Sequence, residues 1–119
     1  MRRTILAVLI GASVLGAGPL QAAGPLLSPA GIAYMKAEEH RIDRQFATRA
    51  AQLGGVPVSV VLDGMPRGPR ITDTGQRIIQ VIERHTGGAL SRDVRAGIQA
   101  ADDERKAALA RAREEAARR

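Results

Sequence analysis

The stretch Leu53-Gly54-Gly55-Val56-Pro57-Val58-Ser59-Val60-Val61-Leu62-Asp63-Gly64-Met65 decides how the rest of the chain is interpreted. Its large apolar side chains alternate with other residues, at Val56, Val58, Val60 and Leu62. Such alternation places side chains on one face of a β-strand, and valine favours strands. Glycines at 54–55 and 64 are typical of strand ends. We therefore predict a short strand at residues 56–62.

No other segment of the sequence is a clear partner for this strand. A lone strand leaves its backbone N–H and C=O groups without hydrogen bonds, so it has to pair with an overlooked segment, with a second copy or with another protein. An unpaired strand is a template for strand addition by a partner. The predicted partner-binding residues lie on the strand and just after it, at Val58, Val60, Met65, Arg67 and Arg70.

Helical patterns flank the predicted strand. Apolar residues recur at helical spacing over residues 29–53, 74–86 and 91–115. Ser28, Asp73 and Ser91 are suitable N-caps, and glycines 54 and 87 are suitable stops. The predicted fold class is mainly α with one short strand and a long C-terminal helix. The expected core residues are Ile32, Ile42, Phe46, Leu53, Val58, Val60, Ile78, Ile82 and Ile98.

The sequence divides into three parts by composition. Residues 1–23 combine a basic start, an apolar run and small residues, which indicates a signal peptide cleaved after Ala22 or Ala23. Residues 24–101 form the small helical domain. Residues 102–119 form a charged, alanine-rich helical tail, which we expect to protrude and fray or to depend on a partner. The expected location is the periplasm, with no transmembrane anchor after cleavage, since the apolar run is shorter than the roughly 20 residues that cross a bilayer.

Composition limits the possible chemistry. The chain has no cysteine, which excludes disulfides and thiol chemistry. Its net charge of +6 is compatible with nucleic acid, but Tyr34 and Phe46 are the only aromatic residues, so nucleic acid is an unlikely partner. No nucleophile motif, metal-ligand spacing or phosphate-binding loop is present. We predict no catalytic, cofactor or metal residues, and therefore a protein that is not an enzyme.

Residues 50–90 resemble part of the periplasmic TrbC family of conjugative pilus assembly proteins. The resemblance is carried by the stretch 53–65, by Thr72 and Thr74 before a helix from Gln76 to Arg84, and by Gly87-Gly88. It implies a partial thioredoxin-like α/β unit. It also implies a non-catalytic assembly component of a conjugative pilus or type IV secretion apparatus, whose partner is another envelope protein or a second copy.

A second resemblance suggests an alternative function. Residues 71–76, Ile-Thr-Asp-Thr-Gly-Gln, are similar to the Leu-Thr-x-x-Gln motif at a helix start in small helical periplasmic stress chaperones and metal-resistance accessory proteins. The charged helical tail also suits that group. This alternative implies that unfolded clients bind to an apolar helical face, whereas the assembly function predicts a contact at the strand.

Overall fold

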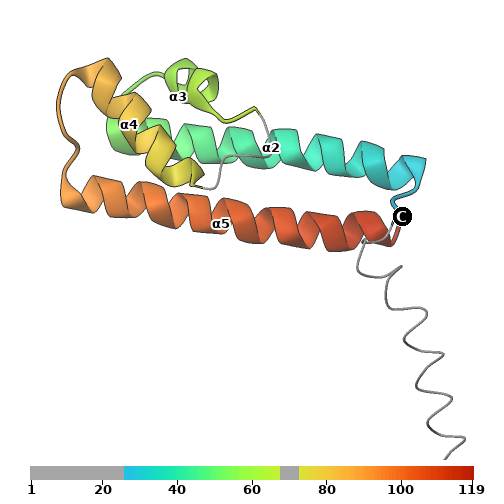
Figure 1. The fold of residues 1–119 in the computed structure, drawn as a ribbon. Helices are drawn as coiled ribbons and strands as arrows, with labels where there is room; N and C mark the ends of the chain where they lie inside the picture. The colour runs from blue at the N-terminus through green and yellow to red at the C-terminus, as the bar shows by residue number, and fades with distance from the viewer. Residues whose placement is uncertain (1–25, 68–72) are drawn as a thin grey trace, which may run out of the picture.

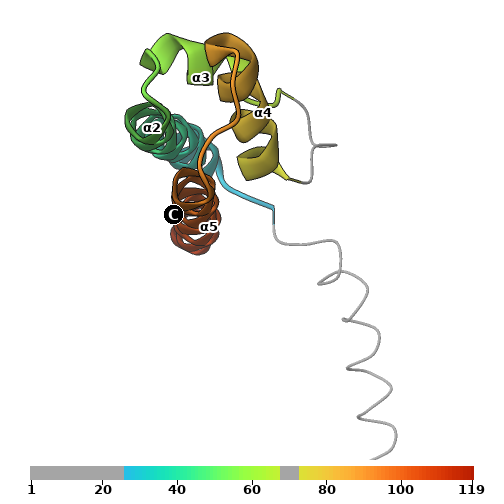
Figure 2. The same cartoon turned by 90° about the vertical axis from the view of Figure 1, so that its left-hand side faces the viewer.

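The computed structural model describes residues 26–67 and 73–119, which contain four α-helices. They are α2 (Pro29–Gly54), α3 (Val58–Gly64), α4 (Thr74–Thr86) and α5 (Arg92–Ala117). The two long helices α2 and α5 lie side by side, and α3 and α4 pack against one end of this pair (Figure 1). Viewed along the long helices, α3 and α4 lie together on one side (Figure 2). This confirms a mainly helical fold with a long C-terminal helix.

Local signals set the helix ends as the sequence predicts. The side chains of Ser28, Asp73 and Ser91 each accept a hydrogen bond from the backbone N–H three residues later, at 2.9–3.1 Å. Helix α2 ends where Gly55 adopts a left-handed conformation with φ of 69°. Gly87 ends α4 in the same way. Helices α2, α4 and α5 therefore begin and end within two residues of their predicted bounds.

The predicted strand at 56–62 is wrong, because this segment forms helix α3. Val61 is fully buried, and Val58, Leu62 and Met65 pack against the same core. These four side chains are spaced as i, i+3, i+4 and i+7, which is the pattern of an amphipathic helix. A helix satisfies its backbone groups internally, so it needs no partner strand. The described residues contain no strand and therefore no part of a thioredoxin-like sheet.

The apolar core forms two clusters along the bundle. The larger cluster lies where all four helices meet and is built around Phe46, Val61, Ile78, Ile82 and Ile98. The smaller one joins α2 and α5 alone, through Met35, Ile42, Ala112 and Ala116. Small residues dominate the contact between the long helices, which allows the two backbones to approach closely.

Most of the expected core is confirmed. Ile42, Phe46, Ile78, Ile82 and Ile98 are buried, whereas Leu53, Val58 and Val60 are half-buried. Ile32 is wrong, since it is 56% exposed. Ile32 belongs to the first turn of α2. The start of α2 lies at the end of the helix pair opposite α3 and α4 (Figure 1).

Residues 102–117 of the C-terminal segment continue α5 without a break. Its Leu109, Ala112 and Ala116 pack against the first half of α2, so this part of the helix lies within the bundle rather than protruding. Along this part of the helix, ion pairs one turn apart join Asp102 to Lys106 at 3.5 Å and Glu115 to Arg119 at 3.4 Å. Arg118 also contacts Glu115, at 3.2 Å.

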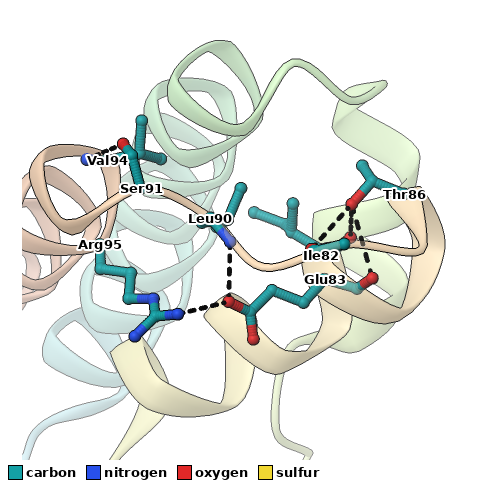
Figure 3. Close-up of polar contacts among 8 residues, drawn as sticks. Ile82, Glu83, Thr86, Leu90, Ser91, Val94 and Arg95 are labelled. Atoms are coloured by element: carbon teal, nitrogen blue, oxygen red, sulfur yellow. Dashed lines mark hydrogen bonds and ion pairs between the residues drawn. The ribbon is translucent and has the colours of Figure 1, made fainter.

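The connection between α4 and α5 is fixed by one carboxylate. Glu83 Oε2 accepts a hydrogen bond from the backbone N–H of Leu90 at 2.9 Å and lies 3.3 Å from Arg95 of α5 (Figure 3). Thr86 donates its hydroxyl to the carbonyl of Ile82 at 3.1 Å on the other side of the turn. These contacts set the direction in which α5 leaves the short helices and returns along α2.

Candidate functional site

The predicted partner-binding residues do not lie along one edge, because residues 58–64 form helix α3. Val58 and Met65 pack against the larger core cluster, and Val60 is half-buried on the same short helix. Arg67 is exposed just after it. Arg70 lies outside the described residues. The residues at 58, 60, 65 and 67 therefore form no continuous strand edge, and the contact by strand addition has no structural basis.

A groove open to solvent is lined by residues of α2 and α5. It has a volume of about 740 Å³. Its floor includes Ile42, Phe46, Ala101 and Ala108, and its charged lining residues are Arg41, Arg44, Arg49, Arg105, Arg111 and Glu104. Five arginines against one glutamate make the surface strongly basic, and we call it the arginine groove.

The arginine groove lies on the side of α5 that α4 leaves uncovered. Asp102 faces α4, because its Oδ2 accepts a hydrogen bond from the backbone N–H of Gly75 at 3.1 Å. Glu104 lines the groove and comes two residues later, which is about 200° round the helix. Helix α4 therefore packs against α5 on a different side from the groove.

Two of the five arginines are held by neighbouring side chains. Arg41 donates two hydrogen bonds to Glu38, at 2.7 and 3.1 Å, and a third to Gln45 at 3.2 Å. Hydrogen bonding to Arg41 lowers the pKa of the Glu38 carboxyl, and the same contact raises the pKa of Arg41. This pair is exposed on the surface of α2, so it contributes orientation more than stability.

Arg105 is held more firmly, at the base of the groove. It donates from Nε to Asp102 Oδ1 at 2.8 Å, and its guanidinium lies 5.8 Å from the centre of the Phe46 ring. Nη1 lies 3.6 Å from Asp43 Oδ1, a distance that gives an ion pair without a hydrogen bond. Burial raises the pKa of the Asp43 carboxyl, against the opposing effect of Arg105.

The remaining three arginines have free guanidinium groups. Arg44, Arg49 and Arg111 are exposed, and no carboxylate of residues 26–67 or 73–119 lies within ion-pair distance of them. An arginine guanidinium binds carboxylate or phosphate through a planar pair of donors. The groove therefore presents unsatisfied anion-binding groups on both helices.

The described residues do not assemble a metal centre. They contain no group of three or more His, Asp or Glu side chains placed to hold a metal ion. Both histidines, His40 on α2 and His85 in the last turn of α4, are exposed. No helix among these residues is long and apolar enough to span a membrane.

Comparison with protein-family models, with curated proteins and with solved structures found no match. The function of this chain therefore has to be argued from its own geometry.

Sequence reasoning did not find the arginine groove. The basic residues of α2 were visible as a polar helix face, and such a face is ordinarily solvated. The sequence does not show that Arg105 and Arg111, more than 50 positions after the arginines of α2, line the same groove. The signal that could have found it is the run of small residues on both helices, which predicts that α2 and α5 pack closely together.

Proposed function

We propose that the protein is an exported, non-catalytic binding component of a bacterial envelope assembly, and that it binds its partner through the arginine groove. The observation that carries this proposal is the set of free guanidiniums of Arg44, Arg49 and Arg111 around one concave surface. Charges arranged in this way attract an acidic partner and set its orientation. The narrower assignment to a conjugative pilus or type IV secretion apparatus is supported by the sequence resemblance of residues 50–90 alone.

The chaperone alternative has one feature in its favour, the helical fold of the described residues. A chaperone of that kind needs an exposed apolar helical face for unfolded clients. Among the described residues, the exposed large apolar side chains are Leu26 and Ile32, at 99% and 56% exposure. Two side chains near one end of α2 provide little apolar area, so we favour a charged partner.

Co-purification from an envelope extract tests the proposal. The groove variant combines Arg44→Gln, Arg49→Gln and Arg111→Gln. A control variant with the same loss of charge combines three exposed arginines that do not line the groove, Arg84→Gln, Arg92→Gln and Arg113→Gln. Circular dichroism first establishes that both variants remain folded.

We expect the wild type and the control variant to recover the same specific partner and the groove variant to lose it. Equal recovery by the groove variant would refute the proposed contact. The location is tested separately by N-terminal sequencing of protein from the envelope fraction, which should begin at Ala23 or Gly24. An intact Met1-Arg2-Arg3 on a cytoplasmic product would contradict export.

A further inference from the structure

The arginine groove has the shape of a seat for a third helix. Its lining spans Arg41 to Gln52 on α2 and Ala101 to Arg111 on α5. At 1.5 Å per residue these segments are about 16 and 15 Å long, which is about three helical turns. The two helices run side by side over this length (Figure 1). A groove between two helices that run side by side fits a third rod of similar diameter.

The floor of the groove permits close approach. Ala101, Ala107 and Ala108 line it on α5 and Phe46 lines it on α2, with the Arg105 guanidinium 5.8 Å from the centre of the Phe46 ring. Small side chains at a helix contact allow interaxial distances of about 8–10 Å. An occupant would therefore present a narrow stripe of small or apolar residues to the floor.

The rims of the groove set the charge of the occupant. Arg44 and Arg49 belong to α2, and Arg111 belongs to α5, so free guanidiniums are available on both sides of the floor. Carboxylates flanking the apolar stripe on both sides would meet them as charge-assisted hydrogen bonds. A second copy seated groove to groove would instead oppose arginine with arginine, which is destabilising.

We propose that the arginine groove binds an acidic amphipathic α-helix of a partner protein, laid along α2 and α5 as a third helix. This inference rests on the proposed function and specifies the class of partner. Nucleic acid is the less favoured occupant, because single strands need exposed aromatic rings for stacking. Phe46 is 4% exposed, and the Tyr34 ring is covered by Arg119, whose guanidinium carbon lies 4.0 Å from the ring centre.

A designed peptide tests this inference on the full mature chain. The peptide has about 16 residues, enough to fold as a helix on a surface, with alanine and leucine at helical spacing and glutamate on both flanks. The first control peptide has the same composition in an order that destroys the helical spacing. Fluorescence anisotropy measures binding at low and moderate salt, and circular dichroism measures the gain in helix. A labelled DNA oligonucleotide, single-stranded and double-stranded, is tested in parallel.

We expect the amphipathic peptide to bind at least about tenfold more tightly than the reordered one and to gain helix on binding. The groove variant Arg44→Gln/Arg49→Gln/Arg111→Gln should weaken binding by at least about tenfold, whereas the control variant Arg84→Gln/Arg92→Gln/Arg113→Gln should leave it unchanged. A tenfold loss corresponds to about 1.4 kcal/mol, which three exposed ion pairs together can supply.

Three results would overturn the inference. Equal affinity for both peptides would mean that the groove binds acidic peptides whether or not they form an amphipathic helix. Tighter, groove-dependent binding of the DNA would assign it to nucleic acid, and absence of binding to the amphipathic peptide would exclude a general helix seat. If the natural partner is still lost from the groove variant in co-purification, the proposed function stands and the helical occupant alone fails.

Discussion

Asp102 offers the sharpest test of how this fold is held together. Its side chain is 1% exposed on α5 and accepts hydrogen bonds from the Gly75 backbone N–H at 3.1 Å and from Arg105 Nε at 2.8 Å. Lys106 Nζ lies 3.5 Å from Asp102 Oδ2, the oxygen that accepts from Gly75. The contact with Gly75 ties the first turn of α4 to the middle of α5, where a carboxylate also suits the positive end of the helix dipole. We predict that Asp102→Ala detaches α4 from α5.

The magnitude follows from what the substitution leaves behind. Hydrogen bonds that involve a charged group contribute about 1.5–3 kcal/mol each, and removing one partner of a buried ion pair costs about 3–5 kcal/mol. Arg105 is 14% exposed and keeps Asp43 as a neighbour, so part of its charge is still compensated. We therefore expect a loss of about 3–4 kcal/mol. For a domain of this size that lowers the melting temperature by roughly 12–30 °C.

Thermal and urea denaturation followed by circular dichroism measures the loss. Asp103→Ala is the matched control, because the neighbouring carboxylate is exposed and should change stability by less than about 0.5 kcal/mol. Asp102→Asn keeps an acceptor for Gly75 but loses the charge, so it should fall between the two. If Asp102→Ala and Asp103→Ala behave alike, the buried network does not hold α4 as described.

Two further predictions concern α3 and the buried charge on α2. Val61→Ala should lower the free energy of unfolding by about 2 kcal/mol, since Val61 is fully buried, whereas Val60→Ala should lower it by less than about 1 kcal/mol. A larger loss for Val60→Ala in urea denaturation would support the predicted strand instead of the helix. Burial raises the pKa of Asp43 above 3.8, so the folded chain holds this proton more tightly than the unfolded chain and stability falls as pH rises through that window. The free energy of unfolding of Asp43→Asn should therefore match that of the wild type near pH 3 and exceed it at pH 7 by about 0.5 kcal/mol. A variant less stable than the wild type at pH 7 would show that the ion pair with Arg105 outweighs the burial.

The long helices could be predicted from the sequence because their signals are local. Ser28, Asp73 and Ser91 bond within their own first turns, and glycine adopts the left-handed end conformation without help from the rest of the fold. The strand prediction for 56–62 was wrong because the apolar residues of this region fit both the period of a strand and that of a helix. Residues 56, 58, 60 and 62 alternate, while 58, 61, 62 and 65 recur at helical spacing. Packing against α2 and α4 decides between them, and strand propensity does not.

The site could not be predicted because its parts come together only in the folded chain. Asp102 looks like one member of the exposed cluster Asp102-Asp103-Glu104, and its burial depends on where α4 lies. The groove arginines likewise belong to two helices whose pairing is set by small residues, which carry a weak sequence signal. The charge pattern therefore predicted exposed residues such as Asp103 correctly, but it could not show that Asp102 is buried where α5 meets α4.

The five groove arginines divide by what holds them, and this division separates binding from stability. Arg105 already has Asp102 and Asp43 as neighbours and lies over the Phe46 ring, so an incoming carboxylate would have to compete with contacts that the fold needs. Arg41 has Glu38, although in an exposed pair that exchanges easily. Only Arg44, Arg49 and Arg111 gain a first charged partner when an acidic helix arrives. None of these three belongs to the network around Asp102. We therefore expect a variant that lacks them to keep its fold and to bind the proposed acidic helix more weakly.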